Sequence, residues 1–269
     1  QGFVGPGLGV SVTEAGVNKG IDFILPYVFQ NLQDLHIDEV DFDGGYLKNI
    51  DVHIDEPAAS DISLKFLHAS NGAEFLVAKS SVELTADFHY KWSFFNVDGK
   101  ADIKVNKAAI DIELDTSTQP STPAYELAPK LDAKKFTISI NPDDIDIQLT
   151  GGLVAKIASI LIPLLKSTVI PEMVQQIETT AITMINDQVD QDLQIYGSQE
   201  EIPFLGGVTV DYAQVGGPEF TADSVFQMGV NGTFFDAQHV KAPADAPAAF
   251  TLHDPKGKDA QGYLTDYTI

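Results

Sequence analysis

The sequence predicts an α+β fold in which a highly twisted antiparallel sheet wraps around a long helix, with a second helix near the N-terminus. Three observations support this prediction. Apolar residues occupy alternate positions through most of the region from Leu35 to Leu149, which is the spacing of strands. On both sides of that region they recur at three- and four-residue steps, and the later helical region is apolar almost all round. Such a helix must be buried on most sides, which a curved sheet allows and a flat sheet does not.

The first helical region extends from Val12 to about Leu32, and Pro26 is expected to kink or divide it. Its apolar residues are Val17, Ile21, Ile24, Leu25, Val28, Phe29 and Leu32. Their spacing places them on one face of a helix, so this segment is expected to pack against the sheet.

The central region predicts a meander of strands with one apolar face. The positions between the apolar residues are largely Asp, Glu, Lys, Ser, Thr and His, so the sheet should have a dry face and a wet face. The apolar positions are Leu47, Ile50, Val52, Ile54, Ile62, Leu64, Phe66, Val82, Leu84, Ala86, Phe88, Tyr90, Trp92, Ala101, Ile103, Val105, Ile110, Ile112, Leu114, Phe136, Ile138, Ile140, Ile145, Ile147 and Leu149.

The second helical region runs from Gly151 to about Ile195, with Pro171 near its middle. Strand patterns resume at Val208 and Val225, and residues 241–249 shift to Ala and Pro, which indicates a linker. The last residues, 263–267, look like the start of a strand that has no partner in its own chain. Lys156, Pro163 and Lys166 interrupt the most apolar stretch, so no membrane span is expected.

Composition excludes several classes of function. The 16 basic residues are all Lys against 39 acidic ones, which gives a formal charge of −23 and makes nucleic-acid binding very unfavourable. The absence of cysteine removes disulfides, thiolate nucleophiles and zinc knuckles. The six histidines have no metal-ligand spacing and no G-x-S-x-G elbow occurs, so neither a metal site nor an enzyme is expected. The triplet Asn231-Gly232-Thr233 is a glycosylation sequon and is compatible with secretion.

Extended segments of the chain resemble the bactericidal/permeability-increasing and lipopolysaccharide-binding protein family. The opening PGLGVSVTEAGVNKGIDFILPYV resembles the family's start, where a PGL turn leads through a strand into a helix. VELTADFHYKW is similar to the strand that enters its basic tip, IDIELDTS to the following hairpin, and FQMGVNGTFFD to a late strand. KAPADAPAAFTLHDPKGKDAQGYLTDYTI resembles its proline-rich linker and the first strand of its second domain.

This resemblance implies half of a boomerang-shaped, two-domain protein, with lipid held between sheet and helix. It implies an N-terminal tubular domain over residues 1–240, a linker over 241–261, and the start of a second domain or docking strand over 262–269. Two departures are visible. The family's N-terminal disulfide is absent, and Pro171 stands about where one of its cysteines would be, so the helix junction is expected to be held by packing alone. The family's tip is cationic, whereas this chain has HYKWSFFN at that place.

The function expected from these observations is non-enzymatic binding and transfer of a phospholipid or fatty acid by a secreted protein, with bound lipid and no other cofactor. An apolar tunnel would be lined by Val17, Ile21, Ile24, Leu25, Val28, Phe88, Tyr90, Ile157, Leu161 and Leu165. Trp92, Phe94 and Phe95 would form a tip that docks peripherally on membrane surfaces. Two alternatives stay open: these residues fill a dry core, or the chain is a protein-interaction or pattern-recognition module in which lipid is only structural. A second domain or protein partner is expected at the C-terminal strand.

Overall fold

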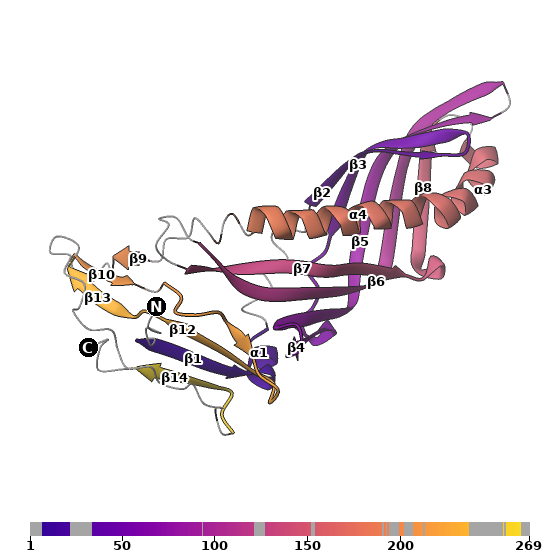
Figure 1. Cartoon of the computed structure of the whole chain (residues 1–269). Helices are drawn as coiled ribbons and strands as arrows, with labels where there is room; N and C mark the ends of the chain where they lie inside the picture. The colour runs from indigo at the N-terminus through magenta and orange to yellow at the C-terminus, as the bar shows by residue number, and fades with distance from the viewer. Residues whose placement is uncertain are drawn as a thin grey trace.

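The computed structural model describes residues 7–21, 34–92, 94–120, 127–151, 154–189, 191, 193, 199–201, 207–211, 213–236, 255 and 257–264. They form a long curled sheet with a helical rod along its concave side, and a smaller β region that contains β1 and β14 (Figure 1). The predicted class, a curled antiparallel sheet with a long helix, is confirmed.

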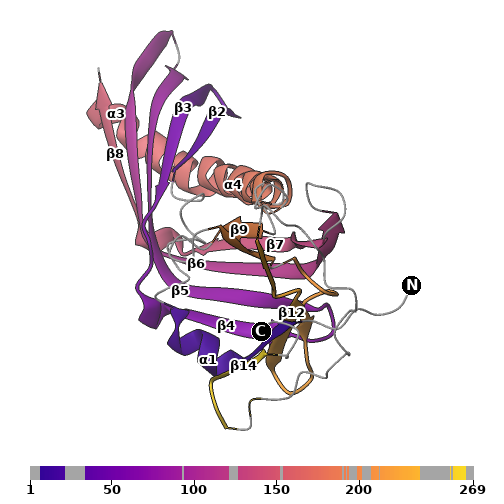
Figure 2. The same ribbon diagram turned by 90° about the vertical axis from the view of Figure 1, so that its left-hand side faces the viewer.

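The large sheet is antiparallel and has the strand order β2-β3-β5-β6-β7, with β4 paired to β5 and β8 paired to β6. Its two central strands have 21 and 26 residues, far more than an ordinary strand, and both bend. Register shifts between Val77, Ser80 and Val82 mark bulges, which bend a strand and raise its twist. Figure 2 shows the resulting curl around the rod. The strands are β2 (Asp34–Phe42), β3 (Gly45–Ile54), β4 (Ile62–Leu67), β5 (Gly72–Trp92), β6 (Phe95–Pro120), β7 (Leu127–Ile140) and β8 (Ile145–Gly151).

The rod consists of α3 (Val154–Leu164), a π-helical turn (Leu165–Val169), α4 (Ile170–Met184) and a second π-helical turn (Ile185–Val189). Pro171 has no N–H to donate to the preceding turn, and the π-helical turn lies directly before it. The helical path therefore continues through the proline instead of breaking there. By length and apolar composition, the stretch Ile157–Asp187 could cross a membrane, but one stripe of it packs against the sheet, as in the core helix of a globular protein.

The smaller β region joins distant parts of the chain. A four-stranded sheet has the order β11-β12-β1-β14, and a three-stranded sheet has the order β13-β10-β9. The bounds are β1 (Leu8–Thr13), β9 (Gln199–Glu201), β10 (Val208–Asp211), β11 (Glu219–Phe220), β12 (Val225–Val230), β13 (Thr233–Asp236) and β14 (Ala260–Leu264), with 3-10 turns at Ala59–Asp61 and Pro142–Asp144.

Two elements differ from the sequence prediction. The first helix, α1 (Glu14–Lys19), begins after Val12 because residues 8–13 pair with β12 and β14 as strand β1, and the Thr13 hydroxyl caps the helix. Residues 22–33, which include Pro26, lie outside the described part. The expectation that the C-terminal strand has no partner is wrong, because β14 pairs along its length with β1.

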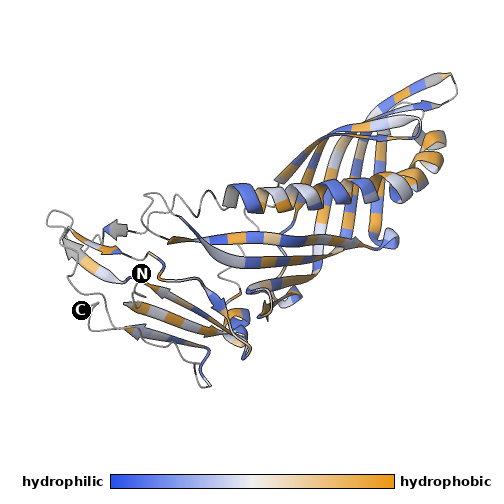
Figure 3. Cartoon of the chain, viewed as in Figure 1, coloured by the Kyte–Doolittle hydropathy of each residue, from blue (hydrophilic) through white to orange (hydrophobic). Residues whose placement is uncertain are grey.

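The core lies between the rod and the concave face of the sheet, where the apolar strand positions and one helix stripe meet (Figure 3). The prediction that the rod is buried on most sides is wrong. Ile160 is 41% exposed, and Ser167, Thr168 and Gln175 are also exposed. The sheet curls only part of the way round, so the opposite face of the rod stays in solvent.

Polar side chains connect the smaller region to the large sheet. The Asn71 amide donates to the carbonyls of Thr116 and Pro218, and its oxygen accepts the Phe220 N–H. On α1, Asn18 exchanges two hydrogen bonds with the backbone of Leu64 in β4. These side chains satisfy backbone groups at strand ends and edges, where no neighbouring strand does so.

Candidate functional site

An apolar cleft lies along the seam between α4 and the strands β5, β6 and β7. All of its lining residues are aliphatic or Met. Strands provide Val82, Leu84, Val105, Ile138 and Ile140, and the helix provides Ile170, Met173, Val174 and Ile177.

The cleft is almost closed. Only about 10 Å³ is left between its side chains, which is no more than one water molecule needs. Seven of the lining residues are buried, whereas Ile140 and Val174 are partly exposed and mark the mouth. A hydrocarbon chain therefore needs α4 and the sheet to separate at this mouth before it can be buried.

Hydrogen bonds attach the rod to the free edge of β7 on both sides of the mouth. The Glu178 carboxylate accepts the Ile138 N–H at 2.7 Å, and the Asn186 side-chain oxygen accepts the Ala133 N–H at 2.6 Å. At the other end, Lys166 Nζ donates to the Pro142 carbonyl at 3.0 Å. The expectation that packing alone holds the helix junction is therefore wrong, because polar side chains also hold the rod on a strand edge.

The described residues that were predicted to line a tunnel lie in or against the same hydrophobic core as the cleft residues, but they do not line the cleft. Phe88, Ile157, Leu161 and Leu165 are buried, and so is Ile21. Val17 and Tyr90 are partly buried and pack against the same core.

Ile24, Leu25 and Val28 lie outside the described residues. None of the seven described members of the predicted set lines the cleft. Their role as lipid contacts stays a prediction.

Sequence reasoning missed the helix side of the cleft, although the signal was present. Met173, Val174 and Ile177 continue the helical period past Pro171, and they face strand positions already predicted to point inward. The period shows that these residues form a stripe. The period does not show which part of the stripe borders a cleft: the part at Met173, Val174 and Ile177 or the earlier turn at Ile157.

The hairpin between β5 and β6 ends in a solvent-exposed aromatic side chain. Phe94 is 96% exposed, and its neighbours Lys91 and Asn96 are exposed as well. Trp92 and Phe95 pair through their backbones, and their side chains lie outside the described set. This places Phe94, as predicted, at a hairpin end where it has no core to fill.

The β2–β3 turn lies beside this hairpin end. The Lys91 N–H donates to the Gly44 carbonyl at 2.7 Å, and Phe42 stacks on Tyr90 with ring centroids 6.2 Å apart. Asp41 and Asp43 are exposed on this turn. The turn beside the hairpin end therefore carries two exposed carboxylates, in addition to Lys91 on the hairpin itself.

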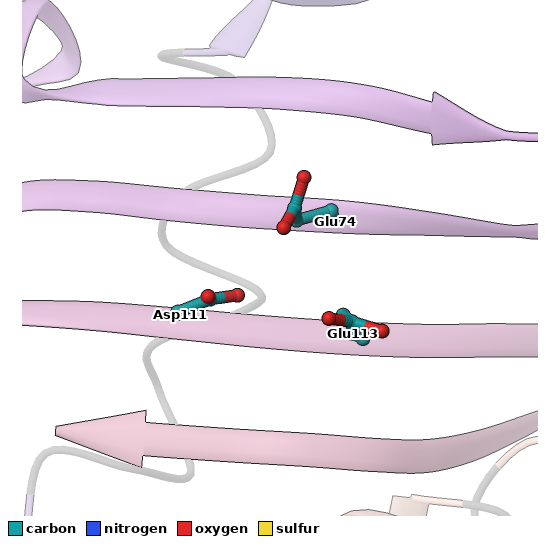
Figure 4. A group of neighbouring side chains, drawn as sticks. All are labelled: Glu74, Asp111 and Glu113. Atoms are coloured by element: carbon teal, nitrogen blue, oxygen red, sulfur yellow. The ribbon is translucent and has the colours of Figure 1, made fainter.

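Three carboxylates gather on the outer face of the large sheet, at Glu74, Asp111 and Glu113 (Figure 4). Lys135 on the neighbouring strand makes ion pairs with both Asp111 and Glu113. These hydrogen bonds, that of Asp111 first, raise the pKa of Lys135 above its ordinary value. The lysine supplies the positive charge that a carboxylate cluster requires, so the cluster is explained by cross-strand pairing.

The sequon asparagine is held by its neighbours. Asn231 Nδ2 donates to an Asp211 carboxylate oxygen at 2.8 Å, and its side-chain oxygen accepts the Thr233 hydroxyl at 2.8 Å. A glycan on Asn231 would have to displace or share the bond to Asp211. Glycosylation there stays a prediction.

No family model matches the chain. Lipopolysaccharide-binding protein of Bos taurus is 26% identical over 164 residues, which make up 60% of this chain and 31% of that protein. The crystal structure of a lipopolysaccharide binding protein matches 98% of this chain with a TM-score of 0.64 and 21% identity. Takeout 1 of Epiphyas postvittana matches 67% of the chain with a TM-score of 0.46 and 12% identity.

In sequence and in fold the chain is similar to lipopolysaccharide-binding protein, after which the bactericidal/permeability-increasing and lipopolysaccharide-binding protein family is named. This confirms the resemblance that the sequence segments indicated. The solved structure shares the fold, in which a curled sheet accompanies a long helix. The chain spans 58% of that solved chain, and the matched segment spans 31% of the bovine protein, so it corresponds to part of these relatives.

Proposed function

We propose that the protein is a non-enzymatic lipid carrier that holds the hydrocarbon part of a phospholipid or fatty acid between α4 and the sheet. The observation that carries this proposal is the cleft at their seam, which is lined by aliphatic side chains and Met alone. A site of this composition has no group that could perform acid, base or nucleophilic chemistry. It can gain roughly 0.8 kcal/mol for each methylene that it removes from water.

The sequence similarity to the bovine relative supports the same function, because that protein is named for the lipopolysaccharide that it binds. For this chain we propose an uncharged hydrocarbon contact instead. The formal charge of −23 and the exposed carboxylates of the β2–β3 turn oppose electrostatic attraction to lipopolysaccharide and anionic bilayers.

Lipid extraction tests the carrier proposal directly. Protein purified without detergent should release lipid into organic solvent, identified by mass spectrometry, and the stripped protein should take up a fluorescent fatty acid or phospholipid. Stripped protein that stays folded and takes up neither probe would exclude the carrier function.

We further propose that Phe94, with Trp92 and Phe95, docks the protein on membrane surfaces during lipid transfer. An exposed Phe that enters a bilayer interface gains about 1.5–3 kcal/mol, which corresponds to about tenfold to a hundredfold in partitioning. Phe94→Ala should weaken binding to neutral phosphatidylcholine vesicles by that factor and slow transfer. The contact is apolar, so salt should change it little.

Leu264→Ala is the matched control for this experiment, because Leu264 is also a highly exposed apolar residue, at 68%, but lies on β14 in the smaller β region (Figure 1). This variant should bind vesicles like the wild type. The triple variant of Trp92, Phe94 and Phe95 to Ala should lose binding further. Unchanged vesicle binding by folded Phe94→Ala protein would refute docking by this tip.

A second candidate function is supported by β14. It is an end strand of the order β11-β12-β1-β14, so no described strand pairs with its outer edge, and Leu264 is exposed there. We propose that a second domain or a protein partner pairs with this edge, which would make residues 241–261 a linker. Extending the chain beyond Ile269, or adding the partner, should protect the β14 amides from hydrogen exchange. An unchanged exchange rate would exclude this pairing.

We also propose an extracellular location, in keeping with the sequon at Asn231. Recovery of the native protein from the extracellular fluid, with a mass shift on glycosidase treatment, would support both points. Native protein confined to the cytosol would exclude the location.

A further inference from the structure

We propose that the seam between α4 and β7 is the entrance of the cleft, and that Lys166 holds the anionic headgroup of a single-chain lipid there. This inference rests on the proposed carrier function and names the ligand class. It comes from the order in which side chains of the rod meet the edge of β7.

The rod and the edge of β7 run antiparallel. Lys166 meets the Pro142 carbonyl, which follows β7, and Glu178 meets the Ile138 N–H within it. Between these two hydrogen bonds lie Val174 and Ile140, the partly exposed members of the cleft lining. Lys166, Ile170, Val174 and Glu178 follow at four-residue steps, so they share one helix face. The mouth is therefore an apolar gap with a cation at one end and a carboxylate at the other.

The two ends of the mouth differ in the charge of the ligand group that they can bind. The Glu178 carboxylate repels an anion, and it already accepts a hydrogen bond from the backbone of β7. Lys166 Nζ has three hydrogens and donates one of them to the Pro142 carbonyl.

Among the described residues, no carboxylate makes an ion pair with Lys166. Asp144, two residues beyond Pro142, pairs with Lys107 at 3.3 Å. A ligand carboxylate at the mouth would thus find its positive partner at Lys166.

The size of the cleft favours one chain. Only about 10 Å³ is left between its side chains, room for no more than one water molecule, so α4 must separate from the sheet to admit a ligand, and one chain requires less separation than the two long chains of a phospholipid. We infer a fatty acid, with its chain along Met173 and Ile177 and its carboxylate at Lys166.

Displacement of a neutral dye tests the headgroup assignment. N-phenyl-1-naphthylamine bound to the whole chain is displaced by dodecanoate or by dodecanol, which share a chain and differ in charge. The wild type should prefer dodecanoate by about two- to fivefold, the size of an exposed ion pair. Lys166→Met should abolish the preference and leave dodecanol binding unchanged, and Lys166→Arg should retain it. Lys258→Met, at an exposed lysine of the smaller region, is the control and should behave like the wild type.

The outcomes separate this inference from the carrier function. A preference for dodecanoate that persists in Lys166→Met, or a wild type without any preference, overturns the headgroup assignment while the carrier function stands. Binding of neither ligand overturns both.

A blocked mouth tests the entrance independently of charge. Val174→Trp places a bulky ring at the partly exposed position of the mouth, so it should slow the uptake of both ligands by tenfold or more. Thr179→Trp, on the exposed face of the same helix, should leave uptake unchanged. Wild-type uptake by folded Val174→Trp protein would show that ligands enter elsewhere and would overturn the entrance.

Discussion

Truncation of Met173 to Ala is the sharpest test of how the rod packs on the sheet. Met173 is 1% exposed and lies in the middle of the seam, between the strand residues of the cleft and its helix neighbours Ile170 and Ile177. The substitution removes three heavy atoms from this contact. At about 0.8 kcal/mol for each, their transfer to water alone costs roughly 2.4 kcal/mol. With the remaining cavity included, the total should reach about 3–5 kcal/mol.

Thermal unfolding followed by circular dichroism measures this cost. With about 2–4 °C for each kcal/mol in a domain of roughly this size, Tm should fall by about 6–20 °C. Ile160→Ala is the control on the same rod, because Ile160 is largely outside the core and should lose less than about 1 kcal/mol. The enlarged apolar space should also bind N-phenyl-1-naphthylamine more tightly, as engineered apolar cavities bind small hydrocarbons. Equal Tm values for the two variants would refute the packing of Met173 described above.

Two further predictions concern residues outside the cleft. Asn71 has φ of +55° and donates to two carbonyls. Both Asn71→Ala and Asn71→Gly lose these hydrogen bonds, but alanine is strained at this φ and glycine is not. Asn71→Ala should therefore lower the free energy of unfolding by about 1 kcal/mol more than Asn71→Gly. Urea unfolding measures both, and equal values would contradict the strain. The hydrogen bond from Lys104, and then the charge of Lys104, lowers the pKa of Glu83. The pair therefore stabilises the fold at pH values above the ordinary Glu pKa, and this stabilisation is lost as the pH falls through the lowered pKa. Lys104→Met should therefore raise the pKa of Glu83 towards its ordinary value in an NMR titration, and an unchanged titration would contradict the pairing.

The sequence by itself determined the local structure and the chemical character of the chain. Alternation in the central region predicted strands with one dry face, and the residues at those positions, such as Leu84 and Ile138, are indeed buried. Helical spacing likewise placed Ile157, Leu161 and Leu165 on one stripe, which the structure confirms as buried. These properties depend on neighbours within a few positions, so a periodic pattern records them.

The tertiary structure alone decided how these elements meet. The spacing of the rod residues does not reveal that Val174 faces Ile140 or that Lys166 reaches Pro142, because these pairs are set by the path of the chain between them. The extent of the curl depends on bulges near Ser80, which an alternating pattern does not locate. The sequence therefore overestimated how far the sheet encloses the rod.

The pairing of β14 with β1 is the contact between the most distant parts of the sequence that the local pattern could not predict. Leu8 aligns with Leu264, almost the whole chain away, and nothing in either segment identifies the other. An apolar or alternating segment indicates that a strand needs partners, because its backbone groups must be satisfied. Only the folded chain decides which partner is close enough to satisfy them.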